Sequence, residues 1–322
     1  MMTISAIQTK INEAIRLLKY PEKPAELYYP IVYILEDGGK RLRPTLLLLA
    51  YNLYSDDIEK ALKPSIGLEV FHNFTLLHDD IMDKADTRRN RPTVHKKWNE
   101  NVAILSGDAM MIHSFQYFYN LPDDVFKPAL ELFTKTALEV CEGQQFDMNF
   151  ETQENVSIKD YMEMIRLKTA VLIAASLKLG GIIAHAPEKD LDLLYKAGIS
   201  LGLAFQLQDD YLDVYGDTSV FGKNIGGDIE ANKKTFLMLT AFEKANSQQL
   251  NQLKFYFNAE MSRQQKVESI TSIYNQIGVP FITQQKVQEL TNEALNLINQ
   301  LTVKEKTSEL KLLITSLIAR NK

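Results

Sequence analysis

The sequence predicts an all-α protein, and three observations support this prediction. Apolar residues recur at helical spacing through most of the chain, as they do at Ile4, Ile7, Ile11, Ile15 and Leu18. The 322 residues include only 14 glycines and 10 prolines, so residues that interrupt helices are few. No stretch alternates apolar and polar residues between turn signals, as a strand would. We therefore expect a helical bundle around one large core.

The expected helices follow one another along the chain. The first covers Ile4–Leu18, and Thr45–Tyr54 is apolar on nearly all sides, which predicts a buried helix. Five longer helices are expected over Ile58–Met82, Asn99–Tyr119, Asp123–Phe150, Ser157–Ala184 and Lys189–Tyr215. The segment Gly216–Lys234 holds four glycines and several charges and is expected to be a loop, and amphipathic helices are expected from there to Lys322.

Composition narrows the class of protein. The net charge of −5 does not favour a nucleic-acid binder, and no partner of that kind is expected. The single Cys141 excludes an internal disulfide and fits a reducing cytoplasm, where we expect the protein. No stretch reaches about 18 apolar residues, so no membrane span is expected. No linker or repeat divides residues 1–322, which predicts a single domain.

An acidic motif ends the expected helix over Ile58–Met82. Its sequence is Asp79-Asp80-Ile81-Met82-Asp83, and Asp79 and Asp83 lie one helical turn apart on the same face. Carboxylates at that spacing repel one another unless a cation lies between them. Mg²⁺ prefers carboxylate oxygens and combines few protein ligands with phosphate oxygens of a substrate. The simpler interpretation of this motif alone is an acidic helix end on the surface.

A second copy, Asp209-Asp210-Tyr211-Leu212-Asp213, makes the metal interpretation stronger, and basic residues accompany both motifs. Two such motifs are expected to face each other across a central cavity, with divalent ions and an anionic ligand between them. Arginine and lysine are the natural partners of phosphate oxygens. The basic residues near the motifs are Arg88, Arg89, Lys40, Arg43, Lys223, Lys233 and Lys234.

The order of these motifs resembles the trans-prenyl diphosphate synthase family over most of the chain. The matching segments are Gly38-Gly39-Lys40-Arg41-Leu42-Arg43-Pro44, Leu76 to Asp83, Arg88 to His95, Gly107-Asp108, Glu142-Gly143-Gln144, Lys168-Thr169, Phe205 to Asp213, Gly222-Lys223 and Gly226 to Ile229. The resemblance implies an all-α isoprenoid synthase fold with a central cavity and a homodimer, for which Ala103–Tyr119 is a candidate interface. Burial of that helix in the core explains its apolar character equally well.

The resemblance also implies substrates, cofactor and residue roles. The substrates would be isopentenyl diphosphate and an allylic diphosphate, and the cofactor would be Mg²⁺, with three ions once diphosphate is bound and Mn²⁺ as a substitute. Asp79, Asp83 and Asp209 would bind the metal, supported by Asp80 and Asp213. The allylic diphosphate would be held by Arg88, Lys168, Lys223 and Lys233. The diphosphate of isopentenyl diphosphate would be held by Lys40, Arg43, His72 and Arg89. Thr169 and Gln206 would place oxygens near the developing carbocation.

Three rival interpretations remain. A class I terpene cyclase shares the fold, but its second motif is usually of an Asn/Ser/Glu type, whereas this one is rich in aspartate. A non-catalytic partner subunit usually loses one acidic motif, and both are intact. A metal phosphohydrolase would typically recruit several histidines as metal ligands, and the whole chain has only five, which makes this interpretation weaker than that of a cyclase.

The helix before Asp79 is expected to limit product length. Phe74 lies about 7.5 Å and Phe71 about 12 Å below Asp79, at roughly 1.5 Å per residue, and both are bulky enough to block a growing chain. Thr75 stands where family members that stop at farnesyl often carry an aromatic residue. We therefore expect a C15 to C20 product, with geranylgeranyl slightly favoured, although Phe71 and Phe74 would also suit a plain core.

Overall fold

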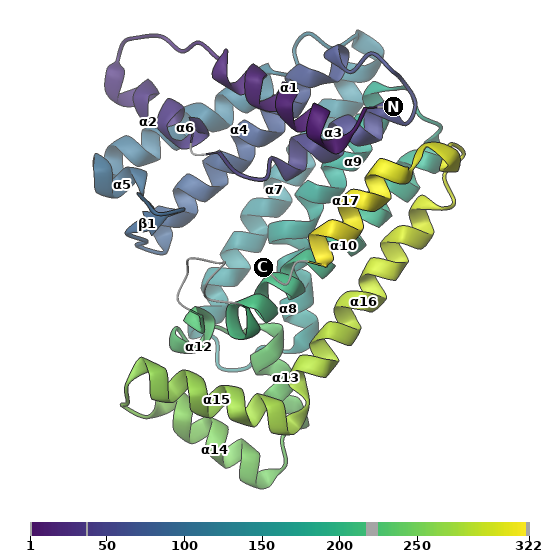
Figure 1. Ribbon diagram of the computed structural model, residues 1–322. Coiled ribbons are helices and arrows are strands. Elements are labelled where there is room, and N and C mark those ends of the chain that lie inside the picture. The colour runs from purple at the N-terminus through teal and green to yellow at the C-terminus, as the bar shows by residue number, and fades with distance from the viewer. Residues whose placement is uncertain (1, 37, 217–224, 320–322) are drawn as a thin grey trace. The chain divides into compact units, whose positions relative to one another are not determined.

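The computed structural model describes residues 2–36, 38–216 and 225–319, and helices make up nearly all of the regular structure in these ranges (Figure 1). The strands within them are β1 (Thr87–Arg88) and β2 (Arg91–Pro92), which pair antiparallel as a short hairpin. The all-α prediction is therefore confirmed, with this hairpin as a small exception. No helix in the described part of the chain is both long and apolar enough to span a membrane.

The chain forms two compact units that interleave in sequence. Unit 1 consists of Met1–Thr134, Ala175–Leu194 and Glu305–Leu310. Unit 2 consists of Lys135–Ala174, Tyr195–Lys304 and Lys311–Lys322. The first acidic motif belongs to unit 1 and the second to unit 2. A single domain over residues 1–322, with a cavity between the two motifs, therefore stays a prediction.

Unit 1 is built around a long central helix. Its helices are α1 (Ile4–Arg16), α2 (Ala25–Glu36), α3 (Leu42–Asn52), α4 (Glu59–Met82), α5 (Val94–Lys97) and α6 (Glu100–Gln116). Helix α4 packs against α3 and α6. A Cβ atom at Gly67 would lie 2.9 Å from the carbonyl oxygen of Ser114, so only glycine lets α4 approach α6 so closely. This packing fixes the end of α4, where Asp79 and Asp83 lie.

Unit 2 contains most of the later helices. Those that lie wholly within it are α8 (Ile158–Ile165), the π-helix η1 (Arg166–Ala170), α12 (Gly227–Glu230), α13 (Phe236–Lys244), α14 (Ser247–Asn258), α15 (Arg263–Ile277) and α16 (Val279–Ile298). Five elements contain residues of both units: α7 (Asp123–Thr152), α9 (Val171–Ile183), α10 (Glu188–Tyr215), the 3₁₀ turn η2 (Lys304–Lys306) and α17 (Ser308–Ile318). Figure 1 shows α14 and α15 as neighbouring helices joined by a short turn.

The stretch expected as one helix over Ser157–Ala184 is interrupted by the π-helix. Ser157 begins it with a capping box, in which its hydroxyl accepts a hydrogen bond from the backbone of Asp160. The π-helical turn follows at Arg166–Ala170, and α9 continues from Val171. A Cβ atom at Gly202 of α10 would lie 2.4 Å from the Cα of Ala170, so α10 touches the π-helix through a glycine. This contact places Gln206, one turn further along α10, beside Thr169.

Candidate active site

The three carboxylates of the first acidic motif point in two directions, one into the core and two outward. Asp80 is 3% exposed, whereas Asp79 is half-buried and Asp83 is exposed. The backbone N–H of Asp83 donates to the Asp79 carbonyl at 2.8 Å, so the α-helical geometry continues to the end of the motif. Asp79 and Asp83 therefore form an outward pair one turn apart, and the central Asp80 points into unit 1.

Asp80 is bound by Arg88. The Arg88 Nε donates to Asp80 Oδ1 at 2.8 Å, and this pair holds the β1–β2 hairpin against the end of α4. Burial raises the pKa of Asp80, although the charge and hydrogen bond of Arg88 oppose this shift. Arg88, predicted from its position after the motif, is thus placed by the motif's own central carboxylate.

The positive charges of four arginines act on His72 of α4, among them the predicted diphosphate-binding Arg43, Arg88 and Arg89. The fourth is Arg41. Desolvation and these positive charges hold the pKa of His72 well below its ordinary value, so the ring is neutral at pH 7. A neutral imidazole can still donate one hydrogen bond to a phosphate oxygen. That Arg43, His72 and Arg89 contribute to one site stays a prediction.

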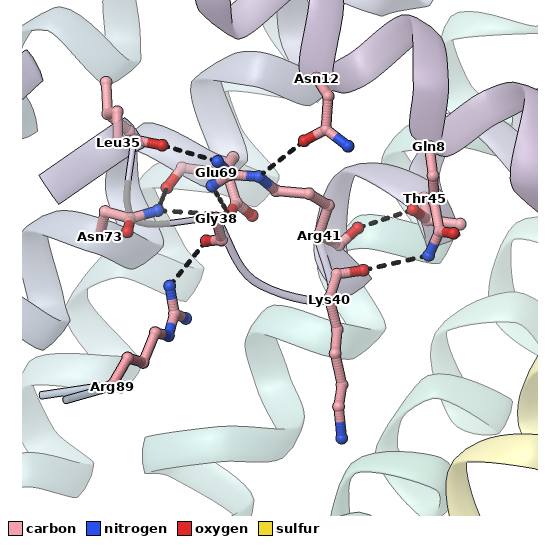
Figure 2. A network of polar contacts seen from close by, with 10 residues as sticks. All are labelled: Gln8, Asn12, Leu35, Gly38, Lys40, Arg41, Thr45, Glu69, Asn73 and Arg89. Atoms are coloured by element: carbon pink, nitrogen blue, oxygen red, sulfur yellow. Dashed lines mark hydrogen bonds and ion pairs between the residues drawn. The ribbon is translucent and has the colours of Figure 1, made fainter.

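The two glycines before Lys40 give Arg89 its place. Gly38 and Gly39 both have positive φ, at 71° and 124°. The Arg89 Nη1 donates to the Gly38 carbonyl at 2.7 Å, as Figure 2 shows, and a Cβ atom at Gly39 would lie 3.0 Å from the same nitrogen. Larger residues here would be strained and would displace the guanidinium. The Gly38-Gly39 backbone therefore holds the guanidinium of Arg89, from the β1–β2 hairpin, against the loop that carries Lys40.

In the second motif, as in the first, the central aspartate is buried and the outer two are more accessible. Asp210 is 5% exposed, and Asp209 and Asp213 are half-buried. Asp213 binds two backbone N–H groups. Its Oδ2 accepts a hydrogen bond from the Asp228 N–H at 2.9 Å, and its carbonyl accepts one from the Gly226 N–H at 2.6 Å. Asp213 is therefore tied to the first turn of α12.

Asp210 is the centre of a buried hydrogen-bond chain in unit 2. It accepts a short hydrogen bond from the Tyr161 hydroxyl and a 3.0 Å bond from Gln206 Nε2. The Thr169 hydroxyl donates to Gln206 Oε1 at 3.0 Å. Burial, followed by the charge of Asp228, raises the pKa of Asp210 to about 7. The chain fixes the Gln206 amide and through it the Thr169 hydroxyl, the two residues predicted to lie near the reacting carbon.

The lysines of unit 2 are partnered by a carboxylate outside the predicted site residues. Lys168 Nζ lies 2.6 Å from Asp147 Oδ2 on α7. Burial alone would raise the pKa of Asp147, but the charges of Lys233 and Lys168 outweigh it and lower the pKa. Asp147 is therefore an anion that is hydrogen-bonded to Lys168 and stabilised by the charge of Lys233, two of the lysines predicted to bind the allylic diphosphate. Lys223, the third, lies outside the described residues, as does Gly222.

The π-helix directs Lys168 and Thr169 towards different helices. Lys168 contacts Asp147 of α7, and Thr169 contacts Gln206 of α10. A Cβ atom at Gly143 would lie 2.2 Å from the backbone nitrogen of Lys168, so α7 passes the π-helix at a distance that only glycine allows. π-Helical turns occur often at functional sites. The Glu142-Gly143-Gln144 segment thus has a packing role next to Lys168.

The carboxylates fit a divalent ion that is completed by phosphate. No group of three or more potential ligands gathers in one place among the described residues. Mg²⁺ does not require such a group, because it is usually bound by one or two carboxylates together with substrate phosphates and waters. The outward pairs Asp79/Asp83 and Asp209/Asp213 have this composition. The metal ligands themselves stay a prediction.

The residues expected to limit product length lie in an aromatic cluster of unit 1. Phe71 is 1% exposed, with its ring centroid 5.2 Å from that of Phe133. Phe74 is 8% exposed and packs against Phe71 at 5.4 Å and against His78 at 4.8 Å. The Thr75 hydroxyl donates to the His72 carbonyl at 2.8 Å. Phe74 is the more accessible of the two rings and lies nearer the acidic motif.

Comparison with known proteins agrees with these features. The polyprenyl synthetase family model matches residues 24–277. A geranylgeranyl diphosphate synthase of Methanosarcina mazei is 40% identical over 237 residues, which is 73% of each chain. A geranylfarnesyl diphosphate synthase of Natronomonas pharaonis is 37% identical over 249 residues, 72% of this chain and 73% of the relative. A crystal structure of a geranylgeranyl pyrophosphate synthase superimposes with a TM-score of 0.95 at 43% identity and covers both chains fully. The resemblance seen in the motifs is confirmed, and the chain belongs to the polyprenyl synthetase family.

Proposed function

We propose that this protein is a short-chain trans-prenyl diphosphate synthase, which joins isopentenyl diphosphate to an allylic diphosphate and releases diphosphate. The observation that carries this proposal is that α4, which carries His72, ends at the outward Asp79/Asp83 pair, where Asp80 holds Arg88 at 2.8 Å. Burial and the positive charges of four arginines also keep His72 neutral. Asp79 follows His72 by seven residues, about 10.5 Å at roughly 1.5 Å per residue. Positive charge near His72 and a carboxylate pair at that separation suit two diphosphate groups, one on each substrate.

Each unit would contribute different groups to the reaction. In unit 1, Lys40, Arg43, His72 and Arg89 would bind the diphosphate of isopentenyl diphosphate, and Arg88 would bind the allylic diphosphate. In unit 2, Lys168, Lys233 and the undescribed Lys223 would hold the allylic diphosphate. Asp79, Asp83 and Asp209, supported by Asp80 and Asp213, would hold Mg²⁺ ions, which when bound would offset the negative charge of the leaving diphosphate. Their number stays a prediction.

The chemistry then follows from charge and position. The bond between C1 of the allylic substrate and its diphosphate oxygen breaks, and Arg88 and Lys168 stabilise the negative charge that develops on the leaving group. The Thr169 and Gln206 oxygens would stabilise the allylic cation. The double bond of isopentenyl diphosphate attacks C1 and forms the new carbon–carbon bond. This attack leaves a positive charge on C3 of the isopentenyl unit. A proton then leaves C2 of that unit for the departing diphosphate, and a double bond forms between C2 and C3.

One assay tests this proposal against the rival functions. The purified protein is incubated with Mg²⁺, isopentenyl diphosphate and dimethylallyl, geranyl or farnesyl diphosphate in turn, and diphosphate release and products are measured. We expect release that requires both substrates and yields linear prenyl diphosphates. Release from an allylic diphosphate alone, with a cyclic hydrocarbon as product, would instead identify a terpene cyclase. No turnover at all would favour a partner subunit.

For product length we propose geranylgeranyl diphosphate, in agreement with the relative from Methanosarcina mazei. Phe74→Ala is expected to lengthen the product, because removing a large side chain next to the acidic motif leaves space for the chain. Phe71→Ala is the matched comparison, since its ring packs more deeply against Phe133. If both variants fold and still make the wild-type product, the block lies elsewhere.

A homodimer through α6 is proposed as the assembly. Ala103 and Met110 are fully buried in unit 1, whereas Leu105 and Ile112 are each 59% exposed on the same helix. An exposed apolar face of this kind is a typical interface core. Leu105→Glu with Ile112→Glu should convert the dimer to a monomer in sedimentation, and a wild-type monomer at micromolar concentration would contradict the proposal. The cytoplasmic location stays a prediction.

A further inference from the structure

Arg41 differs from the other basic residues of the Gly38–Pro44 segment. Its side chain is almost fully buried, whereas Lys40 is exposed and Arg43 is half-buried. Because its side chain is buried, Arg41 is not placed to contact a diphosphate, as Lys40 and Arg43 are proposed to do. Burying a guanidinium is costly unless its donors are satisfied, so its partners show what it does.

The Arg41 guanidinium joins three helices of unit 1. Nη1 lies 2.8 Å from Glu69 Oε1 on α4, and both side chains are less than 5% exposed. Nη2 donates to the carbonyl of Leu35, near the end of α2, at 2.6 Å. Nε donates to Asn12 Oδ1 of α1 at 3.3 Å. Figure 2 shows the guanidinium at the centre of these contacts.

Glu69 is in turn oriented by Asn73, one turn further along α4. Asn73 Nδ2 donates to the Glu69 carbonyl at 2.8 Å and to Glu69 Oε1 at 3.3 Å. The same helix carries His72 next to Asn73. The Arg41–Glu69 pair therefore connects the Gly38–Pro44 segment directly to the helix that presents His72 and Asp79.

Hydrogen bonds hold the backbone of the segment at three of its residues. Arg41 has φ 46° and ψ 41°, a left-handed conformation that is uncommon for residues other than glycine. Internal donors satisfy the carbonyls of Gly38, Lys40 and Arg41, from Arg89, Gln8 and Thr45 respectively. Lys40 leaves the network on the side opposite the Arg41 guanidinium in Figure 2.

A buried ion pair is a poor source of stability, because apolar residues of similar volume often serve as well or better. Its advantage is direction: the five donors of a guanidinium lie in a fixed plane and fix the atoms they contact. We infer that Arg41 is a positioning residue that holds the left-handed turn and so directs Lys40 and Arg43 towards the diphosphate of isopentenyl diphosphate. This inference rests on the proposed function.

The test separates position from stability and from charge. Arg41→Met with Glu69→Leu removes the pair and retains an apolar filling, and Arg41→Lys retains the charge without the planar fork. We expect KM for isopentenyl diphosphate to rise roughly tenfold to hundredfold in both, because small misplacements of binding groups have effects of that size. KM for the allylic diphosphate should change less than about twofold. The matched control, Tyr54→Phe, removes a half-buried hydrogen bond to Asp190 elsewhere in unit 1 and should leave both KM values unchanged.

Other outcomes would overturn the inference. Normal KM for isopentenyl diphosphate in the double variant would remove the positioning role, and so would an equal rise in both KM values with a lowered melting temperature. Recovery of normal KM in Arg41→Lys would show that charge alone matters. If the wild-type protein does not consume isopentenyl diphosphate, the proposed function fails. Binding of inorganic pyrophosphate by calorimetry then decides the role of Arg41, which is supported only by affinity at least tenfold weaker in both Arg41 variants than in Tyr54→Phe.

Discussion

Asp80 in unit 1 and Asp210 in unit 2 occupy the same position in their motifs, and both turn away from the outward pair into the core. Their partners differ. Asp80 is bound by the cation Arg88, whereas Asp210 is bound by the neutral donors Tyr161 and Gln206. The same three-aspartate pattern thus holds a positively charged guanidinium in unit 1 and two neutral hydrogen-bond donors in unit 2.

The basic residues show a related contrast. In unit 1, Arg88 and Arg41 have carboxylate partners in Asp80 and Glu69, but the hydrogen bond that places Arg89 is accepted by a neutral group, the Gly38 carbonyl. Burial and the positive charge of these arginines lower the pKa of His72. In unit 2, Lys168 already has a carboxylate partner in Asp147. A diphosphate binding to Lys168 must compete with Asp147, whereas one binding beside His72 enters an existing field of positive charge. We therefore expect the site of unit 1 to be preorganised and that of unit 2 to exchange partners on binding.

The largest effect is expected for the outward aspartates. Asp79→Ala or Asp209→Ala should lower kcat by about three orders of magnitude, equivalent to roughly 4 kcal/mol of barrier, because each would remove a metal ligand. The melting temperature without metal should stay equal or rise, since repulsion between neighbouring carboxylates is relieved. Steady-state kinetics and calorimetry test both parts. Near-normal activity of Asp79→Ala in Mg²⁺ would show that the site is wrongly assigned.

Asp80→Asn should have a smaller effect that depends on Arg88. The variant retains the shape of the side chain but weakens its hold on the guanidinium, so kcat/KM for the allylic diphosphate should fall by roughly tenfold to hundredfold. Loss of the buried charged partner should cost about 1–3 kcal/mol of stability. In a double-mutant cycle, Asp80→Asn should add little to Arg88→Ala. Additive effects on kcat/KM would mean that Asp80 acts independently of Arg88.

Tyr161→Phe tests the dipolar side of the contrast. Removing the hydroxyl deprives Asp210 of one donor and loosens Gln206 and Thr169, so kcat should fall about tenfold with little change in either KM. Stability should fall by about 1 kcal/mol, the usual contribution of one hydrogen bond. Phe242→Leu, in a separate cluster of unit 2, is a suitable stability control. A change in KM at constant kcat would place Tyr161 in substrate binding instead.

The smallest effect concerns His72 and pH. The pKa of His72 is lowered in the folded protein, so below its unfolded value of about 6.5 the unfolded chain binds the extra proton and stability falls. His72→Gln removes this dependence and can still donate a hydrogen bond. The melting temperature of the wild type relative to His72→Gln should therefore be constant above about pH 7 and decline below pH 6.5. A constant difference down to pH 5 would show that His72 becomes protonated without cost.

The helices and the acidic motifs were predictable because their signals are local. Periodicity located α4 to within one residue at its start, and the spacing of Asp79 and Asp83 was enough to indicate a shared helix face. The supporting residues were not predictable, because their partners lie far away in the sequence. Arg41 and Glu69 are 28 residues apart, and Tyr161 and Asp210 are 49 apart. A weak local signal did exist for Asp147, which lies one helical turn after Gly143 of the Glu142-Gly143-Gln144 segment.

The π-helix at Arg166–Ala170 has a consequence for how this chain tolerates insertions and deletions. A π-helical turn contains about one residue more than an α-helical turn, so the segment behaves as a single-residue insertion in a helix that is otherwise regular. Deleting one residue there would restore an unbroken α-helix from Ile158 to Ile183. The residues after the turn would keep their hydrogen bonds and their direction around the helix axis, because the π-helical turn is what accommodates the extra residue. Only the residues within the turn would change direction. Such a deletion would spare helix content while separating Lys168 and Thr169 from their separate partners, and it would be silent in circular dichroism but visible in turnover.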